Sequence, residues 1–441
     1  MTGAVTEPAA GLAAGLAALR ERPVSGYDKG FGAVAPVTPA GLARQRPDLF
    51  GGGFSTPVLV LADSALRHNV AAMAAFTRAA GVDLAPHGKT TMAPQLFARQ
   101  LAAGAWAMTA ATATHMRAYR AFGVPRILLA NELTDPAGIA WLAAELAADP
   151  GFECFVYADS LAGVRLLDDV LTAAQPGRPL PVLVELGFDG GRTGCRTQAQ
   201  ALSVAAAVRA TSTLRLAGAA GYEGGIGHEC TPATLDLVRA YCRRLRELGG
   251  ALEPMAASPG GLILTAGGSS FFDIVAAELP AGGWTERGHR VVLRSGAYIA
   301  HDHGLYDGLT PGTASRLEGE PTRAGPALRP ALELWTHVLS RPEPALAVLA
   351  AGRRDVSFDA GLPVPLRVRK LDGARASAAG MRVTQLNDQH AYLSVPADSG
   401  LAPGDLLALG ISHPCTTFDK WRVIPVVDDG YRVIDAVHTF F

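Results

Sequence analysis

The sequence predicts a (β/α)8 barrel followed by a smaller, mostly β domain. Two observations support this fold class: eight short β-like segments alternate with helical stretches, and the alternation ends beyond Gly304. The composition agrees with a large core, because 49% of the 441 residues are hydrophobic and 18% are charged. One large domain and one smaller domain are therefore expected.

The composition also limits the classes of partner. A formal net charge of −1 and a sequence pI near 6.8 provide no broad attraction for nucleic acid or for anionic membranes. We find no signal peptide and no run of roughly 20 uninterrupted apolar residues. No two cysteines form a Cys-x-x-Cys pair, so a reduced, cytoplasmic protein is expected. The cysteines are Cys154, Cys195, Cys230, Cys242 and Cys415.

The regular pattern begins after an arm of residues 1–55, which is rich in Ala, Gly and Pro. Pro57–Leu61 predicts a strand, and Asp63 or Ser64 can cap the helix that follows. The barrel is expected over residues 56–308. Its eight predicted strands are Leu84–Lys89, Trp106–Ala110, Ile127–Asn131, Cys154–Ala158, Val182–Leu186, Leu216–Tyr222, Leu262–Ala266 and Val291–Arg294.

An open doubly wound sheet is the competing architecture, and spacing alone does not exclude it. The count of eight favours the barrel.

The C-terminal region, residues 309–441, predicts a β domain because its strand-like segments lack long helices between them. The proline within the last of these segments indicates an edge position. The segments are Ala331–Leu339, Ala345–Ala350, Pro365–Leu371 and Val423–Val427.

One lysine lies where a barrel carries its chemistry. Lys89, in the run Pro86-His87-Gly88-Lys89-Thr90-Thr91, closes the first predicted barrel strand. Catalytic groups gather at the C-terminal ends of barrel strands. A semi-buried lysine there has a lowered pKa and can form a Schiff base, whereas a lysine with its ammonium group in water is the simpler interpretation.

This motif, the eight-fold alternation and the trailing β domain resemble the fold-type III pyridoxal-phosphate enzymes, the alanine racemase-like group. Pro-His-x-Lys-Thr is similar to the branch that contains D-serine dehydratase and D-threonine aldolase. The resemblance extends from about Thr56 to Phe441 and implies pyridoxal phosphate on Lys89. Thr91-Met92 departs from the eukaryotic dehydratase pattern and is more similar to bacterial amino acid deaminases.

Further residues are candidates for cofactor binding. Gly267, Gly268 and Ser269 follow the seventh predicted strand, where such barrels often bind phosphate, although a simple turn is an equal alternative. Tyr222 resembles the family tyrosine near the cofactor, and Arg192 can face the cofactor or solvent. The resemblance also suggests Tyr298 near the phosphate.

His413 and Cys415 are the candidate metal ligands. Two residues apart on an extended segment, they point to the same side, and imidazole with thiolate suits zinc. A packed or solvated pair is the alternative. The resemblance places the family's metal ligands here, with zinc in the dehydratases and a harder metal such as manganese in the aldolases.

Two further histidine-containing groups have no settled role. His301, Asp302 and His303 follow the eighth predicted strand and suit substrate or supporting contacts better than metal binding. Asp388-Gln389-His390 can form a turn, or can orient the metal site or a subunit contact.

The resemblance implies dehydration and deamination of a β-hydroxy D-amino acid of the D-serine type, giving a 2-oxo acid and ammonia. Cys415 favours this reaction over aldolase cleavage to glycine and an aldehyde. A non-catalytic pyridoxal-phosphate carrier is the alternative from another class. The substrate stays open, with 3-hydroxyaspartate or an amino sugar acid among the options, and a homodimer is implied.

Overall fold

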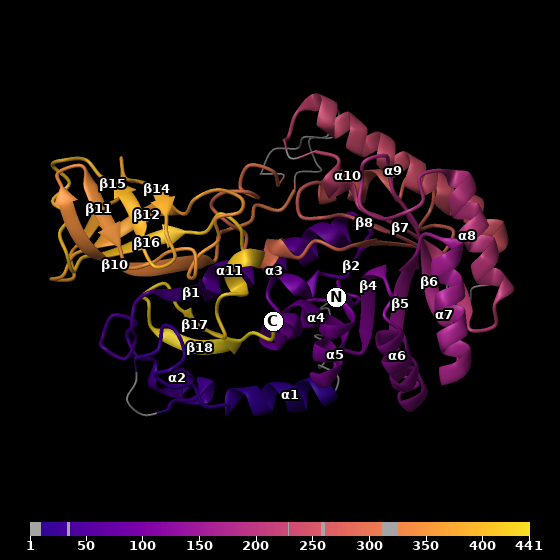
Figure 1. The fold of residues 1–441 in the computed structure, drawn as a ribbon, viewed down its shortest axis with the longest axis horizontal. Helices are drawn as coiled ribbons and strands as arrows, with labels where there is room; N and C mark the ends of the chain where they lie inside the picture. Colours follow the sequence, from indigo (N-terminus) through magenta and orange to yellow (C-terminus); the bar gives the residue numbers. More distant parts are fainter. Residues whose placement is uncertain (1–9, 33–35, 228, 257–260, 311–324) are drawn as a thin grey trace.

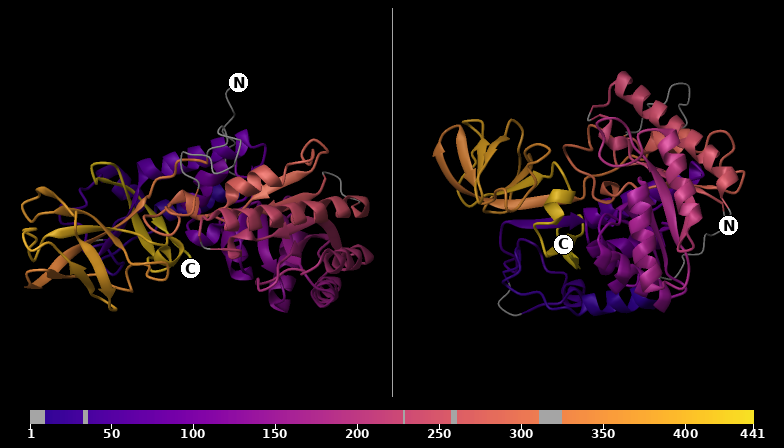
Figure 2. Two further views of the ribbon diagram at one scale, coloured as in Figure 1. Left: turned by 90° about the horizontal axis from the view of Figure 1, so that it is seen from above. Right: turned by 45° about the vertical axis from the view of Figure 1, so that its right-hand side comes forward.

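The computed structural model describes residues 10–32, 36–227, 229–256, 261–310 and 325–441. These residues form two sheets, one curled and parallel and the other mainly antiparallel (Figure 1). Seen from above, the barrel and the C-terminal strands lie side by side along the long axis of the molecule (Figure 2). Within these ranges, no helix has both the length and the apolar character needed to cross a membrane.

The parallel sheet confirms the predicted barrel. In the described ranges its eight strands have the order β2-β9-β8-β7-β6-β5-β4-β3, and a bridge between His87 and Thr109 joins the two ends. The strands are β2 (Asp83–Leu84), β3 (Met108–Ala110), β4 (Arg126–Glu132), β5 (Glu153–Ala158), β6 (Leu180–Leu186), β7 (Leu214–Gly221), β8 (Ile263–Ala266) and β9 (Arg290–Leu293).

Helices cover the outside of the barrel and alternate with its strands (Figure 1). Several begin at a polar cap followed by proline, as at Asp135-Pro136 and Thr231-Pro232, where the cap side chain accepts backbone hydrogen bonds. The helices are α3 (Asp63–Ala79), α4 (Pro94–Ala102), α5 (Ala113–Ala121), α6 (Pro136–Ala148), α7 (Leu161–Ala174), α8 (Gln198–Ala210), α9 (Pro232–Leu252) and α10 (Phe272–Glu278).

The interior of the barrel changes from apolar to polar toward the C-terminal ends of the strands. Apolar interior positions include Leu183, Ile263 and Val292. Two residues further along the same strands lie Glu185, Thr265 and Arg294, and alternate strand residues share a face. A polar layer therefore closes the barrel core at the end where a functional site is expected.

The second sheet is built largely from the C-terminal region, but it also contains a strand from before the barrel. Strand β1 (Val58–Ala62) pairs with β10 and β17. The other strands are β10 (Leu332–Glu343), β11 (Leu346–Leu349), β12 (Val364–Arg369), β13 (Arg375–Ser377), β14 (Arg382–Leu386), β15 (Ala391–Ser394), β16 (Leu406–Gly410), β17 (Val423–Val427) and β18 (Val433–His438). The predicted lead-in strand thus belongs to the β domain, which both ends of the chain build together.

Pro425 does not mark an edge strand as expected, because β17 lies between β1 and β18. The pairing of β17 with β1 involves only Val426 and Val427, so Pro425 needs no N–H on that side.

The N-terminal arm packs onto the rest of the molecule. Helix α1 (Ala10–Arg20) contacts α4, and α2 (Pro39–Gln45) contacts β18. Helix α2 starts at Thr38, whose hydroxyl accepts a hydrogen bond from the Gly41 amide. The arm therefore links the barrel to the β domain.

Candidate active site

A cavity of about 240 Å3 opens at the C-terminal mouth of the barrel. Most of its lining comes from barrel strands and the loops after them, and Cys415 comes from the β domain. The lining residues on which the site depends are Lys89, Arg192, Tyr222, Gly267, Gly268, Ser269, Arg294, Tyr306 and Cys415. The cavity therefore brings together most of the residues that the sequence singled out.

Lys89 lies in a 3-10 turn, Gly88–Thr90, and not on the strand that was expected to end with it. Strand β2 stops at Leu84, and an isolated bridge between His87 and Thr109 follows before the turn. The side chain of Lys89 is accessible through the cavity that it lines. Burial by the surrounding protein still lowers the pKa of its ammonium group.

Close packing explains why the lysine motif has a glycine at position 88. A Cβ at this position would lie 2.5 Å from the Tyr119 hydroxyl and 3.0 Å from the Phe97 ring. Both aromatic residues are buried and belong to the helices behind the turn. Only glycine lets the Lys89 turn pack this closely against α4 and α5.

Arg192 and Tyr222 face each other across the cavity mouth. The guanidinium carbon of Arg192 lies 4.5 Å from the centre of the Tyr222 ring, which is a cation–π contact. The Tyr222 amide donates to the Tyr241 hydroxyl at 3.0 Å, which fixes the loop after β7. Arg192 stays exposed at the rim, so its charge is available to an anion.

The expected phosphate cradle is only partly available. The amides of Gly267 and Gly268 donate to the buried Glu223 carboxylate at 2.9 Å and 2.6 Å. The Ser269 hydroxyl lies beside them and accepts a hydrogen bond from the Ala297 amide at 3.3 Å. The glycines therefore shape the wall of the cavity, and their two amide donors are already occupied.

Arg294 and Tyr306 are among the lining residues that the sequence analysis did not single out. Arg294 is 6% exposed and donates to the Thr265 hydroxyl at 2.8 Å and to the Gly221 carbonyl at 2.5 Å. Tyr306 reaches the cavity because one Asp302 oxygen accepts three backbone amides, from Gly304 and from residues 306 and 307. Neither residue lies in a motif, although Arg294 closes a predicted strand.

Tyr298, expected near the phosphate, does not line this cavity. Its ring is 2% exposed, and its hydroxyl accepts a hydrogen bond from Gln100 at 3.0 Å. It borders a separate cavity between α3 and α4. Tyr298 therefore packs the barrel wall, and we leave it out of the proposed cofactor site.

The metal pair sits at a bend. Cys415 opens the short helix α11 (Cys415–Phe418), so His413 and Cys415 do not share the extended segment that was expected. Their side chains nevertheless meet. Burial alone would lower the pKa of His413, but hydrogen bonds and charge from Cys415 and Asp359 raise it to about 9.

Asp359 holds the other side of the His413 ring, with its Oδ2 2.7 Å from Nδ1. A carboxylate on one ring nitrogen commonly orients a histidine whose other nitrogen binds metal. The Cys415 thiol lies 3.4 Å from the Thr90 hydroxyl, beside Lys89. These contacts make the pair a suitable metal site at the edge of the cavity.

His301, His303 and His390, the histidines without a settled role, are not among the residues that line the cavity. His301 and His303 follow the last barrel strand, and each has a buried Nδ1 without a partner among the described residues. His390 is exposed in the turn between β14 and β15, as the turn interpretation predicted. Only Asp302 acts on the cavity, through the turn that positions Tyr306.

The residues present fit pyridoxal phosphate. An aldehyde requires an accessible amine, which Lys89 supplies, and an anionic phosphate is favoured by Arg192 and by the Ser269 hydroxyl. The buried Nδ1 of His87, also a lining residue, has no partner among the described residues and calls for a polar ligand.

Comparisons with known proteins agree with this two-part architecture. Residues 62–277 match the family model described as alanine racemase, N-terminal domain, and residues 331–427 match the putative serine dehydratase domain. A D-threonine aldolase from Arthrobacter sp is 28% identical over 85% of this chain and 89% of its own.

Two solved structures show the same fold. The D-threonine aldolase from Filomicrobium marinum has a TM-score of 0.72 and 24% identity, covering 88% of this chain and 95% of its own. The D-threo-3-hydroxyaspartate dehydratase from Delftia sp. HT23 has a TM-score of 0.68 and 21% identity. The match covers 88% of this chain and 97% of the dehydratase chain. Variants of this dehydratase replace a histidine and a cysteine two positions apart, and the cysteine variant is described as metal-free.

The site and the comparisons together define the class of protein. This chain joins an alanine racemase N-terminal domain to a D-serine dehydratase-like domain.

The close packing at Gly88 leads to a first prediction. Gly88→Ala should destabilise the protein by about 1–3 kcal/mol, because a methyl group there overpacks the contact with Tyr119. The matched control is Gly250→Ala in α9, where nothing lies within 4 Å and alanine should be neutral or stabilising. Chemical denaturation of both variants measures the difference, and equal stabilities would contradict the packing account.

The environment of Lys89 leads to a second prediction. Because burial lowers its pKa, more of its amine is unprotonated at neutral pH than in an ordinary lysine. The rate of pyridoxal-phosphate uptake, followed by absorbance against pH, should therefore have its midpoint below about 10.5. Lysine acetylated on its α-amino group, with a free side-chain amine, is the reference under the same conditions. A midpoint for the protein at or above the midpoint of this reference would contradict the burial argument.

Proposed function

We propose that this chain is a pyridoxal-phosphate-dependent lyase that acts on a β-hydroxy D-amino acid. The observation that carries the proposal is the meeting of Lys89 and Cys415 in one cavity, the first from the barrel and the second from the β domain. The relatives support the same class, because they are named for D-threonine or for 3-hydroxyaspartate, which carry a β-hydroxyl group.

Lys89 binds the cofactor and then accepts a proton from the substrate. When bound, pyridoxal phosphate supplies a conjugated ring that takes up the electrons released at Cα. The lowered pKa of Lys89 favours a neutral amine, which can accept a proton from the substrate within the cavity.

Arg192 and Tyr222 bind and orient the anionic parts of the ligands. The guanidinium group of Arg192 lies over the Tyr222 ring and cannot swing freely into solvent without losing that contact. Its charge at the rim favours a phosphate or a substrate carboxylate. Arg294 is already hydrogen-bonded within the barrel, so it supports the polar floor of the cavity.

His413 and Cys415 would hold a divalent metal. Imidazole and thiolate donors favour zinc, while manganese or another divalent ion is the alternative for this class. Such a metal would supply a Lewis acid that polarises the β-hydroxyl of the substrate. Asp359 fixes the ring orientation that this role requires.

Cleavage of the Cα–Cβ bond is the reaction that the relatives favour. The sequence predicted dehydration first, but the curated relatives similar to this chain include a D-threonine aldolase and 3-hydroxy-D-aspartate aldolases, and the solved structure with a TM-score of 0.72 is also an aldolase. In cleavage the β-hydroxyl loses its proton and an aldehyde departs, leaving glycine. The cavity offers the same residues for this reaction as for elimination.

Dehydration is the second candidate, and the spacing of His413 and Cys415 favours it. The 3-hydroxyaspartate dehydratase has variants at a histidine and a cysteine with the same spacing. In this reaction the β-hydroxyl itself leaves, and hydrolysis gives a 2-oxo acid and ammonia. The substrate can be small, as in D-threonine, or acidic, as in 3-hydroxyaspartate.

We also propose that the protein forms a homodimer. Phe358, Leu362 and Val364 are exposed beside Asp359, the partner of His413. An apolar group of this kind next to a site is commonly covered by another chain. A second copy of this chain would complete the edge of the cavity.

Product analysis tests the reaction. With pyridoxal phosphate and a divalent metal, the protein should convert D-threonine to equal amounts of glycine and acetaldehyde and leave L-threonine unchanged. Lys89→Ala should lose at least about 100-fold in rate, because it lacks both attachment and proton transfer. Glycine and aldehyde are measured in parallel with ammonia and 2-oxo acid.

Each outcome of this assay decides between the candidates. If D-threonine, D-serine or 3-hydroxyaspartate gives ammonia and a 2-oxo acid, the reaction is dehydration and the cleavage proposal is wrong. A cofactor-loaded protein that converts none of these substrates would point to a non-catalytic carrier.

A further inference from the structure

Two segments of the β domain build the proposed metal site. Residues 352–359 end with Asp359, and residues 412–421 contain His413 and Cys415. The Asp359 carboxylate joins the segments, because its Oδ2 lies 2.7 Å from Nδ1 of His413. The relative position of the two segments therefore affects the geometry of the metal pair.

Lys29, from the N-terminal arm, contacts both segments at once. Its Nζ donates to the Arg354 carbonyl oxygen at 2.8 Å and to Oδ1 of Asp355 at 3.1 Å, both in the first segment. The same Nζ lies 4.0 Å from the centre of the Trp421 ring, which belongs to the second segment. The Trp421 indole nitrogen donates to the Asp355 carbonyl oxygen at 2.8 Å, so Lys29 lies against a contact that the two segments share.

The groups that Lys29 contacts are almost completely buried. The side chain of Asp355 is 1% exposed, and Trp421 is 1% exposed. Lys29 provides the only ion pair that Asp355 makes among the described residues, and the second Asp355 oxygen accepts the Gly352 amide at 2.9 Å. Removing one partner of a buried ion pair costs far more than removing an exposed one, because the other charge stays buried.

The arm holds Lys29 in a defined turn. The Phe31 amide donates to the Asp28 carbonyl oxygen at 3.0 Å, and Phe31 is buried. A Cβ at Gly30 would lie 3.3 Å from the Trp421 ring, so the turn packs closely against the second segment. The position of Lys29 is therefore set by the arm as well as by its own contacts.

Ser357 joins the same two segments nearer to the metal pair. Its amide donates to the Thr417 hydroxyl at 3.1 Å, and its hydroxyl accepts a hydrogen bond from the His413 amide at 3.0 Å. The segments are thus fastened at two points, one at Lys29 and one at Ser357. Loosening the point at Lys29 lets the segments move relative to each other close to the metal pair.

We propose that Lys29 is a positioning residue for the metal site. It acts through Asp355 and Trp421, which it holds together, so that His413 and Cys415 keep the arrangement that binds metal. This inference rests on the proposed metal site and goes beyond it, because it gives the N-terminal arm a part in metal binding. A role in stability alone would leave the metal affinity of the folded protein unchanged.

The test titrates the full-length protein with Co2+, whose visible absorption reports coordination by a thiolate. Lys29→Met should bind Co2+ about 10–100-fold more weakly than wild type, the usual cost of losing a group that orients metal ligands. Lys29→Arg should restore most of the affinity, because arginine keeps the charge and stacks on aromatic rings. Arg46→Met is the matched control, since Arg46 lies on the same arm and makes an exposed ion pair with Asp428, outside both segments.

A double variant separates positioning from the effect of an unpaired buried charge. Lys29→Met leaves Asp355 without its cation, whereas Lys29→Met combined with Asp355→Asn removes that charge and should still bind Co2+ weakly. Wild-type Co2+ affinity in either protein, shown by thermal unfolding to be folded, would overturn the inference.

The same titration tests the metal site on its own. Cys415→Ala should lose the thiolate absorption that wild type shows. Absence of that absorption in wild type, or its persistence in Cys415→Ala, would contradict the metal site and with it the role of Lys29.

Discussion

The candidate site depends on the docking of α11 against the turn that contains Lys89. The Cys415 thiol meets the Thr90 hydroxyl at 3.4 Å, although the two residues are separated by more than three hundred positions in the chain. This contact exists because β1, from before the barrel, is built into the middle of the C-terminal sheet. The strand ties the β domain to the start of the barrel, and so it brings one metal ligand next to the cofactor lysine.

Burial then gives each polar group its chemistry. The protein around Lys89 lowers the pKa of its amine, while the cavity keeps that amine accessible. Asp359 and Cys415 act on His413 from two sides, and the Arg192 charge is held over an aromatic ring. Each group is placed by neighbours that come from a different strand or domain, which is how a barrel mouth combines distant parts of a sequence.

Much of this arrangement could be predicted from the sequence. Strand alternation indicated the barrel, and the positions of Lys89, Arg192, Tyr222 and the glycine run after predicted strands brought them to one mouth. Other features depend on tertiary contacts that no local pattern encodes. Tyr298 turned toward Gln100 and away from the cavity, and Glu223 took the amides expected to bind phosphate.

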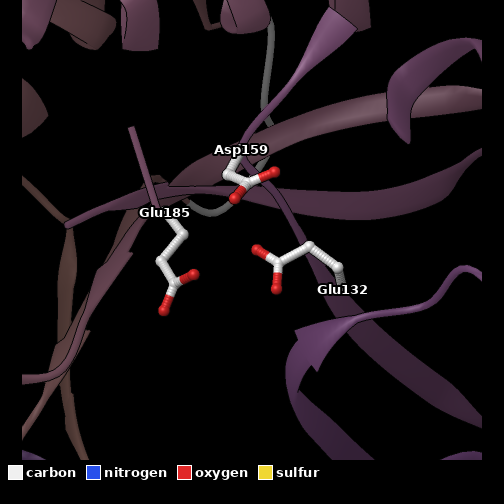
Figure 3. A group of neighbouring side chains, drawn as sticks. All are labelled: Glu132, Asp159 and Glu185. Atoms are coloured by element: carbon white, nitrogen blue, oxygen red, sulfur yellow. The ribbon is translucent and has the colours of Figure 1, made fainter. Parts of the chain in front are cut away.

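The neighbouring carboxylates of Glu132, Asp159 and Glu185, shown in Figure 3, were missed for a related reason. They lie far apart in the chain, and each alone resembles an ordinary acid near a strand end. Only the neighbouring positions of β4, β5 and β6 bring the three carboxylates together.

The central claim is that the Lys89 amine is the attachment point of an aldehyde cofactor. Borohydride reduction of the protein loaded with pyridoxal phosphate, followed by peptide mass spectrometry, tests it most directly. The account predicts a reduced pyridoxyl group on the peptide that contains Lys89, and none in Lys89→Ala. A label on another lysine, with the Lys89 peptide unmodified, would contradict the account.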